Sequence, residues 1–86
     1  MAHLKSRMKK FEVDLNIESG KSKFCFSPIA LSENTKYFVE VKKADQTAVY
    51  FEMVKKKNEG WHIVPPVPLW IQNLEELLTK AIFEYN

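Results

Sequence analysis

Residues 11–18 alternate between apolar and polar side chains, and this pattern constrains the fold more than any other feature of the chain. Phe11, Val13, Leu15 and Ile17 take every second position, with acidic or amide residues between them. Because successive side chains of a β-strand point to opposite faces, such a segment buries one face and exposes the other. Parallel strands are usually apolar on both faces, so the pattern predicts an antiparallel sheet.

Four more segments read as strands. We expect them at residues 23–27, 37–42, 48–55 and 61–64, where apolar and polar residues again alternate or a short apolar run occurs. The short connections predict a meander in which each strand pairs with the next. The loop between the third and fourth strands should have an odd number of residues, or a bulge, to keep their apolar residues on one face.

The first two strands are expected to form a hairpin with a two-residue loop at residues 20–21. Pairing Ile17 with Phe24, and Leu15 with Phe26, puts all four side chains on one face. The loop would begin with glycine, which suits a type II′ turn because the first loop position has a positive φ.

Pro28 is expected to end the second strand, because proline has no N–H to donate to a ladder. Residues 29–35 then read as a connection that contains the turn residues Ser32, Glu33 and Asn34.

Apolar residues recur at spacings of three and four near the C-terminal end, which predicts one amphipathic helix of roughly five turns beginning near Pro68. This stripe consists of Trp70, Leu74, Leu77, Leu78, Ala81, Ile82 and Tyr85. The proline-rich residues 65–68 are expected to form a stiff arm that swings the helix back over the sheet. The fold class predicted is therefore α+β: an antiparallel meander of four to five strands, with one C-terminal amphipathic helix packed across one face.

Eighty-six residues are enough for one domain with one modest core. We expect residues 1–10 to be a flexible basic segment and residues 11–86 to be the domain; whether residues 1–7 belong to the natural protein is left open. The expected core consists of Phe24, Phe26, Val39, Phe51, Trp61, Trp70, Leu74, Leu78 and Ile82.

The sequence has few residues of the kinds that catalyse reactions or bind metal ions. One cysteine, Cys25, and histidines at positions 3 and 62 supply no ligand cluster with zinc spacing, and no glycine-rich phosphate loop is present. We therefore expect no enzyme activity, no metal and no cofactor. A single cysteine without an export signal favours the cytoplasm, and no apolar run reaches the roughly 18 residues that span a bilayer.

The outer face of the sheet is the candidate binding surface. By alternation it displays Phe38, Tyr50, Glu52 and His62, with Lys23 and Lys42 toward a rim. The favoured hypothesis is a non-catalytic module for protein–protein interaction or self-association. The alternative is single-stranded nucleic-acid binding, in which the aromatic rings stack on bases and the lysines hold phosphates.

Two observations weigh against nucleic acid, namely four carboxylates on the same face and the presence of only one arginine, the residue that dominates base and phosphate recognition. The same face also fits an ordinary sheet surface that has no partner, since apolar atoms supply over half of most protein surfaces. A ligand pocket between helix and sheet ranks last, because the core side chains are large enough to fill that space.

Overall fold

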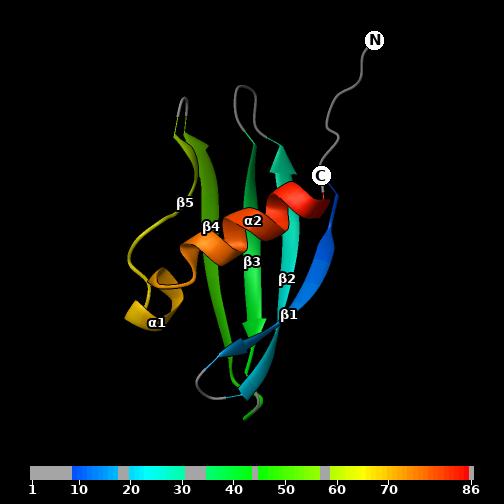
Figure 1. The fold of residues 1–86 in the computed structure, drawn as a ribbon, viewed down its shortest axis with the longest axis vertical. Helices are drawn as coiled ribbons and strands as arrows, with labels where there is room; N and C mark the ends of the chain where they lie inside the picture. The colour runs from blue at the N-terminus through cyan, green and yellow to red at the C-terminus, as the bar shows by residue number, and fades with distance from the viewer. Residues whose placement is uncertain (1–8, 18–19, 31–34, 44, 57–58, 86) are drawn as a thin grey trace.

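The structure of the chain is a computed structural model, and it describes residues 9–17, 20–30, 35–43, 45–56 and 59–85. They form an α+β domain in which each strand pairs antiparallel with the next, so the predicted meander is confirmed (Figure 1). The expected segment 1–10 lies largely outside the described residues. The elements are β1 (Phe11–Ile17), β2 (Gly20–Ala30), β3 (Thr35–Lys42), β4 (Ala48–Lys56), β5 (Gly60–Ile63), α1 (Leu69–Gln72) and α2 (Glu75–Tyr85).

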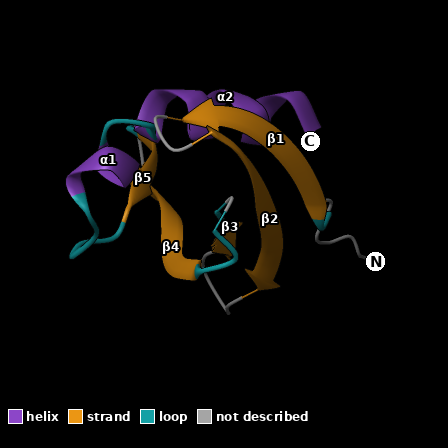
Figure 2. Cartoon of the chain, turned by 90° about the horizontal axis from the view of Figure 1, so that it is seen from below, coloured by secondary structure: helices purple, strands orange, loops and turns teal. Residues whose placement is uncertain are grey.

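The sheet is strongly curled, and α2 lies across its concave side. Seen end-on, the strands of the five-stranded sheet form an arc, and α2 closes the open side between β5 and β1 (Figure 2). The alternating apolar side chains of all five strands point into this space, as the pattern of the sequence predicts. The opposite, convex side of the arc is the outer face.

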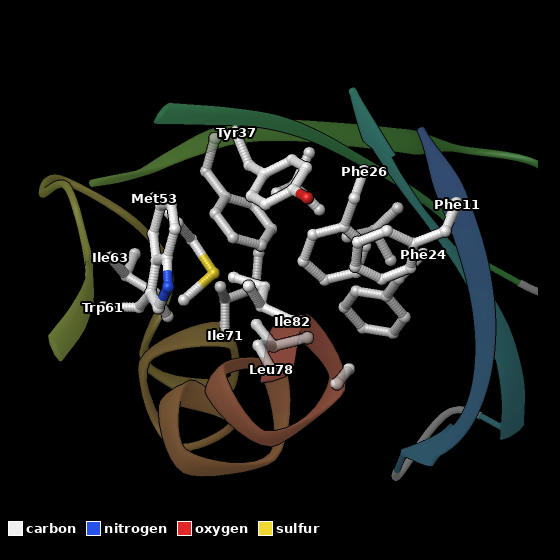
Figure 3. Packing of buried hydrophobic residues seen from close by; sticks show 14 residues of the cluster. Phe11, Phe24, Phe26, Tyr37, Met53, Trp61, Ile63, Ile71, Leu78 and Ile82 are labelled. Carbon is white, nitrogen blue, oxygen red and sulfur yellow. The ribbon is translucent and has the colours of Figure 1, made fainter. Parts of the chain in front are cut away.

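The core is dominated by aromatic rings (Figure 3). Tyr37 lies at its centre with no exposed surface, and its hydroxyl donates to the carbonyl oxygen of Lys9 at 3.4 Å. The rings of Phe11 and Phe26 stack with centroids 4.5 Å apart, and both meet Tyr37 edge to face. Such offset and edge-to-face pairs add to the stabilisation from burial alone.

The predicted hairpin register is wrong. Ile17 lies opposite Gly20 and Phe11 opposite Phe26, so the connection falls at residues 18–19, outside the described residues, and not at residues 20–21. Gly20 has a φ of 115°, but it is the first residue of β2. Both registers keep the apolar side chains on one face, so alternation alone does not distinguish them.

Two structural features favour the observed register. It stacks Phe11 on Phe26, and it keeps Pro28 out of the ladder with β1, because that ladder ends at Phe26. The prediction that Pro28 ends β2 is also wrong, since the strand continues to Ala30 and Pro28 lies opposite Tyr37. Proline is tolerated where one side of a strand has no partner.

The loop between β3 and β4 agrees with the prediction. Lys42 lies opposite Ala48, which leaves an odd-numbered loop at residues 43–47 and keeps Val41 and Val49 on the inner face. Thr47 donates from both its N–H and its hydroxyl to Asp45, at 3.0 and 2.6 Å. These hydrogen bonds lower the pKa of the Asp45 carboxyl.

The predicted single helix is broken into two. α1 ends at Gln72, and α2 begins at Glu75 after a turn at Asn73 and Leu74. In this turn the Leu74 N–H donates to the Ile71 carbonyl three residues back, at 2.9 Å. Asparagine favours such turns because its side chain competes for backbone hydrogen bonds.

The break changes which apolar residues the helices bury. Ile71, which the predicted stripe leaves out, is fully buried, whereas Trp70 and Leu74 are only partly buried against the core. Leu77 and Tyr85 are half exposed. The other expected core residues are buried in the structure, namely Phe24, Phe26, Val39, Phe51, Trp61, Leu78 and Ile82.

Candidate protein interface on the outer sheet face

Phe38 and Tyr50 form an exposed aromatic pair in the middle of the outer face. They lie on neighbouring strands β3 and β4, one diagonal step apart in the register. Their rings stack with centroids 5.7 Å apart and an interplanar angle of 20°. Phe38 is 37% and Tyr50 56% exposed, so the pair keeps much of its surface in water.

Charged side chains border these rings. Tyr50 lies opposite Glu40, and its hydroxyl donates to the Glu40 carboxylate at 3.5 Å. Phe38 lies opposite Glu52, which forms an ion pair with Lys36 at 3.1 Å. We call these five residues the aromatic patch: an apolar centre with a rim of both charge signs.

The structure divides the predicted binding residues between three places. Phe38, Tyr50 and Glu52 belong to the aromatic patch. Lys23 and Lys42 lie directly opposite each other on β2 and β3, beyond Glu40 along the strands. His62 lies opposite Val54 at the β5 side of the sheet.

The sequence-based prediction of the site does not include Lys36 and Glu40, although both belong to the charged rim of the patch in the structure. The signal that finds them is parity, because both share the outward positions of β3 with Phe38. Only the pairing of β3 with β4 shows that Lys36 contacts Glu52 and that Glu40 contacts Tyr50.

His62 joins the sheet to α2. Its Nδ1 lies 3.3 Å from the Glu75 carboxylate, and its Nε2 lies 3.4 Å from that of Glu59, without hydrogen-bond geometry. Glu75 also accepts the backbone N–H of Ile63 at 3.0 Å. These contacts join β5 to α2. Across the described ranges, no group of three or more His, Cys, Asp or Glu side chains is arranged to hold a metal ion.

Cys25 faces acidic neighbours. Its thiol donates to the carboxylate of Glu12 at 3.5 Å. Burial, then this hydrogen bond, and then the negative charges of Glu12 and Glu40 raise the pKa of the thiol above its ordinary value, while Lys23 opposes them. A reactive cysteine needs the opposite environment, one that stabilises the thiolate.

Comparisons with family models, with curated proteins and with solved structures find no match for this chain. In the part of the chain that the structure describes, neither helix is long and apolar enough to cross a bilayer.

Proposed function

We propose that this protein is a non-catalytic interaction module that self-associates through the aromatic patch. The observation that carries the proposal is the stacked, exposed pair of Phe38 and Tyr50 within a charged rim. Protein interfaces commonly have this composition, with aromatic residues at the centre and polar residues around them.

The charges of the rim favour a second copy as the partner. A two-fold interface brings the same patch together from both subunits, so any opposite charge that meets the rim must come from the patch itself. Lys36 supplies a cation, and Glu40 and Glu52 supply carboxylates, within one surface. In a dimer, Lys36 of one subunit can therefore approach Glu40 of the other.

Size-exclusion chromatography with light scattering over a range of protein concentrations tests the proposal. We expect a concentration-dependent dimer with a dissociation constant of about micromolar order. Tyr50→Lys should give a monomer, because it removes one ring of the stacked pair and places a charged side chain, which association would have to desolvate, at the centre of the patch. Phe83→Lys is the matched control, since Phe83 is an aromatic residue of α2 that is 64% exposed, and it should leave the dimer intact.

A wild-type protein that stays monomeric at all concentrations would overturn self-association. So would a dimer that Tyr50→Lys leaves unchanged. Far-UV circular dichroism and thermal melts of both variants check that they fold. Phe83→Lys should melt near the wild type, because exposed side chains outside special contacts usually change stability by under about 0.5 kcal/mol. Tyr50→Lys also loses the ring pair with Phe38, so we expect it to fold but to be less stable by about 1 kcal/mol.

Single-stranded nucleic acid is the alternative ligand for the same surface. The aromatic pair supports it, but Glu40 and Glu52 border both rings, and carboxylates repel phosphates. We expect labelled oligonucleotides to show no binding in fluorescence anisotropy at low salt. Micromolar binding that weakens steeply with salt and is lost in Tyr50→Ala would replace self-association as the proposed function.

A further inference from the structure

The two edges of the sheet differ in how well the backbone of the edge strand is covered. At the β5 edge, side chains of α2 pair with the strand's backbone: Glu75 accepts the N–H of Ile63 at 3.0 Å, and Thr79 donates to the carbonyl of Trp61 at 3.4 Å. β5 is also only four residues long. Short strands and covering helices are the usual means of blocking an edge against other chains.

The β1 edge lacks these protections. Among the strands that the structure describes, β1 pairs with β2 alone, over seven residues in a continuous register without a bulge. It contains neither lysine nor proline, the residues that commonly blunt an edge. Among the described residues, no hydrogen bond reaches the backbone groups on its free side. After Phe11, where Tyr85 of α2 stacks, the strand runs toward the other end of the sheet (Figure 1).

The side chains of β1 define what would fit beside it. On the inner face Val13, Leu15 and Ile17 pack against the core but remain partly exposed, so an added strand with apolar residues at matching positions would cover them. On the outer face Glu12 and Asp14 are exposed. Lys23 lies 3.7 Å from Glu12, whereas Asp14 makes no ion pair with another described residue.

A second copy of β1 is a poor occupant of this edge. In the antiparallel register that pairs all seven residues, Asp14 would lie opposite Asp14 of the second copy. Like charges directly opposite each other on neighbouring strands are destabilising. The acidic outer residues favour a strand with basic residues instead, because opposite charges at these positions stabilise the pair.

We propose that the free edge of β1 binds an extended segment of another protein, in which basic and apolar residues alternate, as an added antiparallel strand. Backbone hydrogen bonds to β1 supply the affinity in such strand addition, and alternate side chains supply the specificity. The basic residues face Glu12 and Asp14, and the apolar residues complete the cover over Val13, Leu15 and Ile17.

The probe is a fluorescein-labelled heptapeptide that alternates lysine and valine, with both ends blocked. Titrated with the full chain at low salt, it should bind with a dissociation constant of about micromolar order. A peptide that alternates glutamate and valine should not bind. A lysine–valine peptide with proline at its centre keeps most of the charge but cannot complete the ladder, so its affinity should fall at least about tenfold.

Asp14→Lys should weaken binding of the lysine–valine peptide by at least about tenfold. Glu84→Lys is the matched control, because it makes the same change of charge at an exposed position of α2, and it should leave the affinity near that of the wild type. Bound peptide should also slow hydrogen exchange of β1 amides.

Three outcomes would overturn the proposal: no binding at low salt, equal binding of the peptide with central proline, or equal losses in Asp14→Lys and Glu84→Lys. The proposal is independent of the aromatic patch. The Tyr50→Lys variant should still bind the peptide, so a failure of self-association and a failure of strand addition are distinguishable.

Discussion

The ring of Tyr85, in the last turn of α2, lies parallel to the ring of Phe11, the first residue of β1, with centroids 4.8 Å apart. Phe11 in turn stacks on Phe26 of β2. Three rings from three elements therefore form one stack that joins the end of the helix to the start of the sheet.

Tyr85→Ala should lower the free energy of unfolding by about 1–2 kcal/mol, because it removes one stacked pair and part of the apolar cover over Phe11. Phe83→Ala is the control. Phe83 lies in the same turn of α2, and no ring of the described residues stacks on it, so its loss should be under about 0.5 kcal/mol. Urea denaturation measures both, and equal losses would show that the stack does not stabilise the fold.

Ser22 should be replaceable without loss. It lies on the inner face opposite Leu15, is 1% exposed, and its hydroxyl has no hydrogen-bond partner among the described residues. A buried hydroxyl without a partner costs about 1–3 kcal/mol, so Ser22→Ala should raise the free energy of unfolding or leave it unchanged. Ser27→Ala, on the outer face, is the comparison. A loss above about 1 kcal/mol in Ser22→Ala would mean that the hydroxyl is satisfied, for example by water.

Glu75→Ala should expose the β5 edge. Its carboxylate accepts the N–H of Ile63, and this hydrogen bond to a partly exposed charged group is worth about 1 kcal/mol. We expect that loss in thermal or urea unfolding, with faster hydrogen exchange of the Ile63 amide. Glu76→Ala removes the same charge from the same first turn of α2 and should leave that amide protected. Equal exchange in the two variants would contradict the role assigned to Glu75.

Cys25 should react slowly with iodoacetamide, and the pH at which its rate is half-maximal should lie above that of an ordinary thiol, because its pKa is raised. Burial and the hydrogen bond to Glu12 favour the protonated form in the folded protein. A raised pKa contributes stability that is present below the unfolded pKa and is lost as the pH rises through the folded value.

Glu12→Gln removes the charge and the carboxylate acceptor, so the midpoint of the rate profile should fall and the rate at a given alkaline pH should rise. The chain unfolded in urea gives the reference rate. A midpoint in the folded wild type at or below that of the chain unfolded in urea would contradict the raised pKa of the thiol.

The alternation predicted correctly on which face of the sheet the side chains lie, whereas it did not predict which residues of the first two strands pair. Alternation placed Val39 and Phe51 inside and Phe38 and Tyr50 outside, and the structure agrees. The hairpin register was wrong because a shift by an even number of positions leaves every face unchanged. Only contacts between strands, such as the Phe11–Phe26 stack, distinguish the alternatives.

The helix shows the same division. Spacing along the chain predicted its position and its apolar character, but not the turn at Asn73 and Leu74 that separates α1 from α2. Ile71 and Trp70 both fit helical spacing with later apolar residues, so the pattern does not decide which of them is buried. Packing against the curled sheet buries Ile71 fully and leaves Trp70 beside Lys43, whose amine lies 5.5 Å from the ring.

The sequence by itself determined a meander of four to five strands, their order and the face on which each side chain lies, because side-chain direction follows from the local backbone of each strand. The tertiary structure decided the register of the hairpin, the break between α1 and α2, and the difference between a β5 edge bonded to α2 and a β1 edge that pairs with no further strand of the described residues. These features depend on contacts between residues far apart in the chain, such as Glu75 with Ile63 and Tyr85 with Phe11, and no local pattern encodes such contacts.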